Sequence, residues 1–142
     1  MRALFAIFVA LALTTTAFAQ ESAIQEFTLD NGLKVILKEN HDAPVINFHV
    51  AFRVGSKYVR PGITGISHLL EHIMFKSTTT RPLGTFDQAL SAVGAENNAN
   101  TWLDRTIYYE TIASDKIDVA LELDADRMRN MQFVPEEHKL GM

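Results

Sequence analysis

The sequence predicts an α+β domain in which helices pack on one face of a mostly antiparallel sheet. Strand-like segments with alternating apolar residues open the domain, at residues 24–29, 33–38 and 45–54. Segments with apolar residues at helical spacing follow, and then two more strand-like segments and a final helical one. Strands and helices grouped in runs are typical of α+β folds.

Asn31-Gly32 joins the first two expected strands and is a strong hairpin signal. Both residues accept positive φ, which predicts a two-residue loop with a type I′ turn. The third expected strand has one fully apolar face, which should meet the core. That face consists of Ile46, Phe48, Val50, Phe52 and Val54.

Residues 65–75 predict a helix that carries a His-x-x-Glu-His motif. At 3.6 residues per turn, His68, Glu71 and His72 fall on one face of this helix. Its apolar side is expected to consist of Ile66, Leu69, Leu70 and Ile73.

Two imidazoles one turn apart with a carboxylate beside them suit a divalent metal and an activated water. Zinc binds histidine nitrogen, and a catalytic zinc site keeps one position open. Glu71 is the natural proton acceptor for such a water. The order is the inverted form of a known zinc-peptidase motif. A chance match with exposed histidines remains the alternative when the motif is taken alone.

The second helix is expected to have Thr85 as its N-cap, with Gln88 completing a capping box and Gly94 ending the helix. Its apolar stripe is expected to consist of Phe86, Ala89, Leu90 and Val93. Strands are expected at residues 96–102 and 105–113, and Ser114 is expected to cap the last helix. One face of that last helix is expected to contain Ile117, Ala120, Leu121, Asp124, Ala125 and Met128.

Residues 1–19 have the pattern of a secretory signal peptide. Arg2 supplies a short positive start, residues 3–13 are an apolar run, and an Ala-x-Ala sequence predicts cleavage after Ala19. The apolar run is short for an uncleaved membrane anchor. We therefore expect residues 20–142 to be exported, to a bacterial periplasm or the cell exterior.

The composition narrows the classes of partner. The formal net charge is −4 and becomes −5 without Arg2, which gives no support to nucleic-acid binding. The chain has no cysteine, so the fold relies on its core and not on disulfides. No second long apolar segment follows, so we expect no membrane attachment after cleavage.

Residues 62–76 resemble the metal-site segment of the insulinase/pitrilysin family of zinc peptidases, which includes the mitochondrial processing peptidases. Asn-Ala-Asn-Thr at residues 98–101, followed by Thr-Ile-Tyr-Tyr at 106–109, resembles the second signature of that family. Residues 121–130 resemble the helix that follows, and Leu-x-Asn-Gly-Leu-x-Val at 29–35 also fits. Several segments in the right order are more specific than one motif.

The resemblance implies a zinc-dependent endopeptidase that acts on peptides or small proteins. It implies Zn²⁺ as the cofactor, His68 and His72 as zinc ligands, and Glu71 as the general base. It also implies that Asn98 and Ala99 lie on an edge strand that binds the substrate as an added strand. The family pairs such a domain with a second, related domain or subunit, which is the implied partner.

The family takes its third zinc ligand from a glutamate that lies beyond the last residue of this sequence, so we expect none in this chain. A supporting glutamate of the family aligns near Gly141. Glu136, Glu137 and His138 have suitable atoms, but their spacing does not place them opposite the motif. We therefore expect residues 20–142 to be a truncated N-terminal portion of the peptidase domain with impaired hydrolysis. The alternatives are a non-catalytic peptide-binding module and an inactive remnant.

Overall fold

The computed structural model describes residues 23–138. The predicted signal peptide and Gly141 lie outside the described residues. The chain divides into two compact units, with the boundary between Ala43 and Pro44. Within the described range, every helix is too short or too polar to cross a bilayer.

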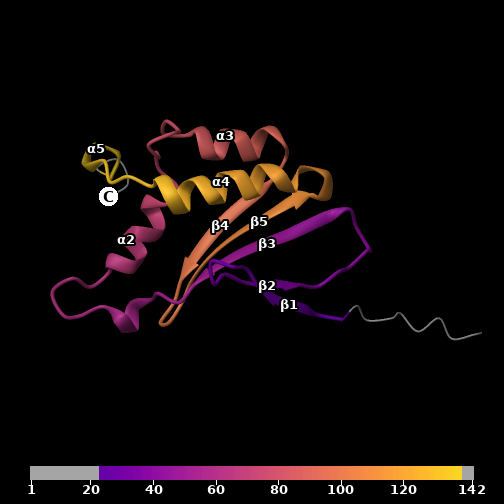
Figure 1. Ribbon diagram of the computed structural model, residues 1–142. Helices are drawn as coiled ribbons and strands as arrows, with labels where there is room; N and C mark the ends of the chain where they lie inside the picture. The colour runs from indigo at the N-terminus through magenta and orange to yellow at the C-terminus, as the bar shows by residue number, and fades with distance from the viewer. Residues whose placement is uncertain (1–22, 139–142) are drawn as a thin grey trace, which may run out of the picture. The chain divides into compact units, whose positions relative to one another are not determined.

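The first unit contains a β-hairpin, as predicted (Figure 1). Strand β1 (Gln25–Thr28) pairs antiparallel with β2 (Lys34–Leu37), and Phe27 lies opposite Val35. The prediction of the two strands is therefore confirmed.

The turn of this hairpin differs from the predicted type I′. Gly32 has a φ of 85°, whereas Asn31 does not have the positive φ that a type I′ turn also requires there. The Gly32 amide donates to the Leu29 carbonyl at 2.8 Å, and the Leu33 amide donates to Oδ1 of Asn31 at 3.0 Å. Because the Asn31 side chain closes the turn by accepting a hydrogen bond, its backbone does not need the left-handed conformation.

The second unit is built on a three-stranded antiparallel sheet in the order β3-β5-β4. Its strands are β3 (Val45–Phe52), β4 (Glu96–Thr101) and β5 (Thr106–Ala113). β5 lies in the centre, so β4 is an edge strand of this sheet. The described strands thus form two sheets, where the sequence predicted one.

The helices of this unit cover one face of its sheet (Figure 1). They are α2 (Ile66–Ile73), α3 (Thr85–Ala92), α4 (Ile117–Asn130) and the short α5 (Pro135–His138), with 3₁₀ turns η1 (Ser56–Tyr58) and η2 (Ser114–Lys116). α3 and α4 lie side by side, and α4 packs on β5. The predicted fold class is confirmed.

The predicted N-caps of α3 and α4 are wrong, whereas Gly94 ends α3 as predicted, with a φ of 69° directly after the C-cap. Gly84, with a φ of 82°, is the N-cap of α3, and no side chain caps it. The Gly84 carbonyl accepts the first helical bond from the Gln88 amide, so Thr85 is already inside the helix. Ser114 opens the 3₁₀ turn η2, so that α4 begins three residues later with Lys116 as its N-cap. The Ser114 amide donates to the Pro44 carbonyl at 3.0 Å.

The hydrophobic core forms where α3 and α4 meet the sheet. It consists of Phe86, Leu90, Ile112, Ala120 and Leu123. The apolar stripe predicted for α3 points into this core. Each fully buried Leu, Ile or Phe contributes about 1.5–3 kcal/mol relative to exposure, so these contacts hold α3 on the sheet.

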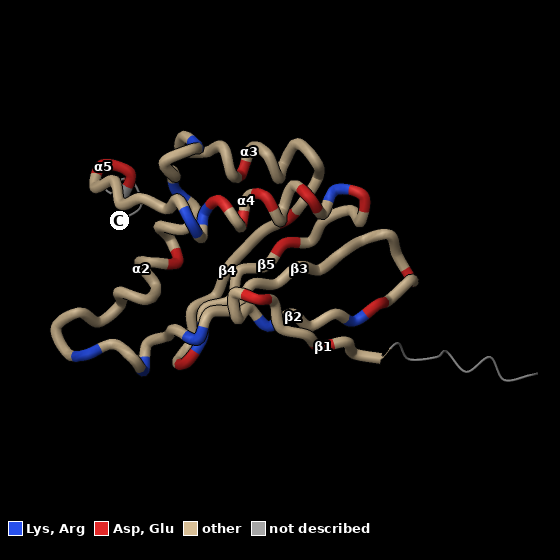
Figure 2. The backbone as a smooth tube through the Cα atoms, in the orientation of Figure 1, with Lys and Arg blue, Asp and Glu red and all other residues tan. Residues whose placement is uncertain are grey.

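The buried face of α4 agrees with the predicted one at Ala120 and Asp124 and differs elsewhere. The residues that point inward are Ala120, Leu123, Asp124 and Arg127. Leu121 and Met128, which were predicted to share this face, are each 46% exposed. Charged residues recur along the whole helix (Figure 2), so apolar spacing alone did not identify the buried side.

Arg127 explains this orientation of α4. Its side chain is 2% exposed and is ion-paired through Nη2 with Glu110 at 2.9 Å and with Asp124 at 2.6 Å. The guanidinium lies 4.7 Å from the ring centroid of Phe86 and 4.6 Å from that of Tyr108. A buried charge needs such partners, and they lie on the side of α4 that faces β5 and α3.

Burial shifts the protonation of this cluster. It raises the pKa of Glu110 to about 7, and the neighbouring charge of Asp124 acts in the same direction. It raises the pKa of Asp124 to about 6, against the opposing attraction of Arg127. Burial also raises the pKa of the Tyr108 hydroxyl to about 12. One arginine does not compensate two buried carboxylates fully, so the folded protein favours a proton on the pair.

We predict that the domain loses stability as the pH rises from 5 to 8. The folded state keeps protons on Glu110 and Asp124 at pH values where the unfolded chain, with ordinary values of 4.5 and 3.8, has released them. The stability from this difference is complete below those values and is lost as the pH rises through about 6 and 7. The thermal midpoint should fall by roughly 5 °C or more.

Glu110→Gln should flatten this dependence, because the amide cannot ionise. Glu122→Gln is the matched control, since Glu122 is an exposed carboxylate on the same helix as Asp124. Thermal unfolding followed by circular dichroism at several pH values measures both. An equal pH dependence in wild type and Glu110→Gln would contradict the assignment.

Candidate metal and peptide site

The helix that carries the His-x-x-Glu-His motif begins at a left-handed glycine. Gly65 is the N-cap of α2 with a φ of 90°, and its carbonyl accepts the Leu69 amide at 2.9 Å. A residue with a Cβ adopts this conformation only with strain, so the glycine allows the chain to turn directly into the helix.

The orientation of α2 differs from the predicted one. The buried residues of this helix are Ser67, Glu71 and Ile73, whereas Ile66, Leu69 and Leu70 are exposed. The reason is that α2 packs against β4 through its Glu71 side. A polar contact with the sheet thus determines which side of the helix is buried.

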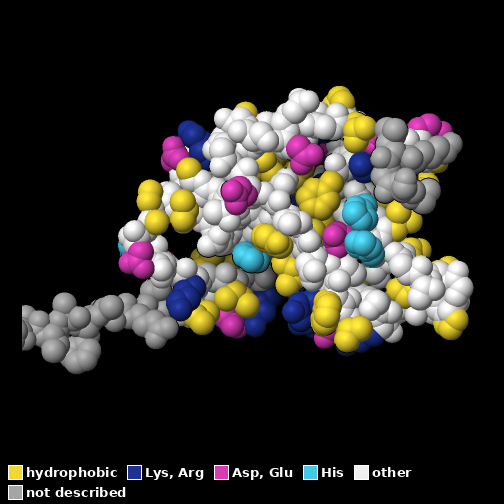
Figure 3. Space-filling view, turned by 180° about the vertical axis from the view of Figure 1, so that it is seen from behind, with side chains coloured by type: hydrophobic (Ala, Val, Ile, Leu, Met, Phe, Trp, Pro, Cys, Tyr) yellow, Lys and Arg dark blue, Asp and Glu magenta, His cyan; other side chains and the backbone are white. Residues whose placement is uncertain are grey.

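The two motif histidines converge on the surface. His68 and His72 are exposed, and their Nε2 atoms lie 3.2 Å apart. Figure 3 shows two histidine side chains together on the open surface, with an acidic side chain against them. Two nitrogen ligands of one tetrahedral zinc ion, each at about 2.0–2.1 Å, lie about 3.3–3.4 Å apart. The imidazole nitrogens therefore fit a shared zinc ion.

Glu71 lies between the histidines and the sheet. Its side of the helix is buried, and Oε2 accepts a hydrogen bond from the Thr101 hydroxyl. Thr101 contacts Thr106 at 3.1 Å between Oγ1 atoms, and Thr106 donates to the Val54 carbonyl at 3.0 Å. Both threonines belong to the second signature of the family, but the resemblance implied no role for them. Only their position opposite α2 identifies them.

Asn98 and Ala99 lie in the middle of edge strand β4, on the same strand as Thr101. Asn98 pairs with Tyr109 and Ala99 with Tyr108 on the central strand. Oδ1 of Asn98 accepts the Ala99 amide at 2.8 Å. The fold thus brings the predicted peptide-binding strand beside the helix that holds the two histidines and Glu71.

The described residues provide no third ligand beside the two histidines. No group of three or more His, Cys, Asp or Glu among the described side chains, those of residues 23–137, is arranged to hold a metal ion, and the side chain of His138 lies outside that range. The Glu137 carboxylate, one of the tail groups considered from sequence, accepts the Ser77 hydroxyl at 2.6 Å and the Ser77 amide at 3.1 Å. It fastens the tail to the segment that follows α2.

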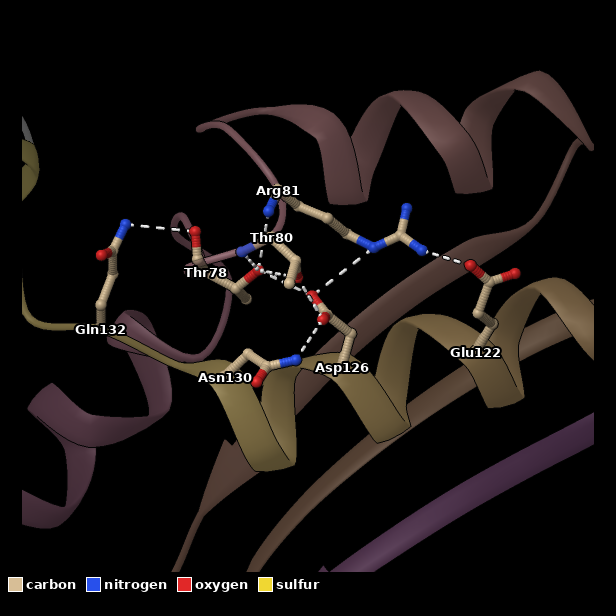
Figure 4. Close-up of polar contacts among 7 residues, drawn as sticks. All are labelled: Thr78, Thr80, Arg81, Glu122, Asp126, Asn130 and Gln132. Atoms are coloured by element: carbon tan, nitrogen blue, oxygen red, sulfur yellow. Dashed lines mark hydrogen bonds and ion pairs between the residues drawn. The ribbon is translucent and has the colours of Figure 1, made fainter.

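Asp126 fixes the segment between α2 and α3 to α4 (Figure 4). Its carboxylate accepts hydrogen bonds from Thr78 at 2.7 Å, from Thr80, and from Asn130 at 2.7 Å, and it lies 3.5 Å from Nε of Arg81. Burial acts to raise the pKa of Asp126, but the hydrogen bonds from Thr80, Thr78 and Asn130 outweigh it and lower the pKa. The charged carboxylate is therefore the form that holds this loop.

Gly55 lets the tip of the β4–β5 hairpin lie against the start of η1. The Ser56 amide donates to the Trp102 carbonyl at 3.0 Å, and the Lys57 amide donates to the Leu103 carbonyl at 2.8 Å. A Cβ atom on Gly55 would lie 2.5 Å from the Trp102 carbonyl oxygen. Only glycine permits this approach, which fixes the end of β4 immediately after Thr101.

Comparison with known proteins identifies the class to which this fold and site belong. Residues 34–140 match the family model described as Insulinase (Peptidase family M16). The chain belongs to the insulinase family of peptidases. The resemblance predicted from the sequence is confirmed, and homologues named as zinc proteases support a zinc peptidase family.

Two curated relatives and one solved structure illustrate the match. An uncharacterized zinc protease of Rickettsia bellii is 35% identical over 112 residues, covering 77% of this chain and 26% of the relative. Zinc protease PqqE of Helicobacter pylori is 36% identical over 118 residues, covering 79% and 27%. The crystal structure of a protease from Helicobacter pylori has a TM-score of 0.79 at 33% identity, covering 84% of this chain and 29% of that one. The chain spans about a quarter of the length of these relatives.

We predict that Gly55→Ala destabilises the second unit by about 1–3 kcal/mol, because the added methyl group meets backbone atoms that have little room to move. Ser56→Ala is the control, since Ser56 is exposed and contacts the hairpin through its backbone. Urea unfolding measures both variants. Equal stability of Gly55→Ala and wild type would show that the hairpin tip is not held in this position.

Proposed function

We propose that this chain carries the histidine pair and the general base of a zinc-dependent endopeptidase that hydrolyses peptide bonds in peptides or small proteins. The observation that carries the proposal is the 3.2 Å separation of the Nε2 atoms of His68 and His72, with Glu71 between them and strand β4. Membership of the insulinase family supports the same reaction.

The residues of the chain have separate roles in this proposal. The Nε2 atoms of His68 and His72 would hold a zinc ion, which when bound would supply a water of lowered pKa and polarise the substrate carbonyl. Glu71 would serve as the general base that accepts a proton from the attacking water and then as the acid that gives it to the leaving amine. The edge of β4 at Asn98 and Ala99 binds the substrate main chain as an added strand, which gives affinity with little sequence preference.

The remaining parts of the site are proposed to come from outside residues 23–138. The described part of the chain has two imidazoles but no third donor, and a catalytic zinc has three protein ligands. We propose that a carboxylate from elsewhere completes the site and that a second, related domain or subunit helps to enclose the peptide. We also propose that the protein is exported and cleaved after Ala19.

A peptide-binding module without catalysis is the second candidate. It is favoured by an edge strand available for strand addition and by the lack of a third donor among the described residues. The two candidates differ at Glu71, because binding of a strand to β4 has no need of a proton acceptor.

We predict that residues 20–142 bind one zinc ion weakly through the two motif histidines. His72→Ala should weaken binding at least about 10-fold, because a single imidazole then remains. His49→Ala is the matched control, since His49 is exposed and stacks on Tyr109 away from the motif. Isothermal titration with zinc measures all three proteins. Absence of zinc binding in wild type, or equal weakening by His49→Ala, would refute the site.

Glu71→Gln distinguishes the enzyme from the binding module. Peptide hydrolysis by the zinc-loaded chain should fall by about 10²-fold or more, because the amide cannot accept the proton. Peptide binding, measured by fluorescence polarisation, should persist, since the edge of β4 is unchanged. If hydrolysis is unaffected by the substitution, the proposed base is wrong. If wild type binds peptide but never cleaves it, the binding module is the better description.

A further inference from the structure

We propose that Thr101 is a positioning residue for the general base. Its hydroxyl fixes Oε2 of Glu71, and Thr106 in turn fixes Thr101. The inference deepens the proposed function and rests on it, because the group that is positioned is the base of that reaction.

A short series of contacts carries the proposal. Glu71 on α2, Thr101 at the end of β4, Thr106 at the start of β5 and the carbonyl of Val54 are linked one after another. Glu71 and Thr106 are buried at 8% and 4% exposure, and Thr101 is half-buried. Thr101 and Thr106 are direct partners across the two strands. The sheet thus presents a fixed hydroxyl to the helix.

The number of hydroxyl protons on Thr101 and Thr106 determines which group donates in each hydrogen bond of this series. Each threonine hydroxyl has one proton, and that of Thr106 is directed to the Val54 carbonyl. The proton of Thr101 therefore has two possible acceptors, Oε2 of Glu71 and Oγ1 of Thr106. A carboxylate is the stronger acceptor, so Thr101 donates to Glu71. Thr106 contributes by holding Thr101 in place.

The position of Thr101 links the base to the peptide-binding strand. Ala99 and Thr101 are two residues apart on β4, so their side chains share one face of the sheet. A peptide paired along the edge at Ala99 would then have its register fixed relative to the same strand that holds Glu71. A base held within a fraction of an ångström of its productive position supports a much faster reaction than a mobile one.

The experiment compares Thr101→Val with Thr101→Ser. Valine keeps the shape of threonine and removes the hydroxyl, whereas serine keeps the hydroxyl. In protein labelled with ¹³C-glutamate, the Glu71 carboxylate signal is assigned by its loss in Glu71→Gln. We expect Thr101→Val to shift the signal and to lower the side-chain order of Glu71, and Thr101→Ser to preserve both. An unmoved signal in Thr101→Val, or an equal change in Thr101→Ser, would overturn the proposal.

Two further variants keep the test decisive. Thr111→Val is the matched control, because Thr111 lies on β5 on the face opposite to Thr106 and donates to Asn47 of β3. It should leave the Glu71 signal unchanged. Should Thr101→Val fail to fold, Thr106→Val removes the hydroxyl behind Thr101 and is expected to lower the order of Glu71 to a smaller extent. An unchanged order in Thr106→Val would then overturn the proposal.

The spectra are recorded without zinc, so this test is independent of metal binding. A wild-type chain that binds no zinc overturns the proposed function. A Glu71 carboxylate signal that is the same in Thr101→Val and wild type overturns the positioning role of Thr101. The two failures are therefore distinguishable in one set of proteins.

Discussion

The buried guanidinium of Arg127 is the group on which the arrangement of the second unit depends. It contacts aromatic rings from the segment after α2, from α3 and from β5, and it is ion-paired with Glu110 and Asp124. Arg127 reaches all of these partners only when α4 has one rotation about its own axis and one position along the sheet. Burial of three charges costs desolvation, so we interpret the cluster as a device that specifies one packing and adds little net stability.

The parts of the fold that depend on local periodicity could be predicted from the sequence. The strands followed from alternation, and the core stripe of α3 followed from apolar residues such as Phe86 and Leu90 at helical spacing. The hairpin at Asn31-Gly32 was predicted, but its turn type was not, because the Asn31 side chain supplies a hydrogen bond that backbone preferences do not include. The predicted N-caps failed because α3 begins at a glycine and α4 continues from a 3₁₀ turn, whereas Gly94 ends α3 as predicted.

The orientations of α2 and α4 could not be predicted, because each is decided by a polar contact with the sheet. Arg127 and Glu71 both occupy positions that a hydrophobic pattern assigns to solvent, and each is buried against partners distant in sequence. The identity of the motif residues was readable from spacing. The Thr101 contact was not, since it becomes visible only when β4 lies beside α2. Polar residues at buried positions were thus the main source of error, and one of them, Glu71, is the proposed general base.

In the proposed site, placement of the base and coordination of the metal are therefore separable. Glu71 is positioned entirely by described residues, through a hydrogen-bond series that ends at the backbone of Val54. The histidine pair converges without help from the sheet, since both rings are exposed and meet across one helical turn. A donor from outside the described residues would thus complete the metal site on a preformed face. It would not need to reorganise α2 or β4, so the main effect of its arrival would be on zinc affinity.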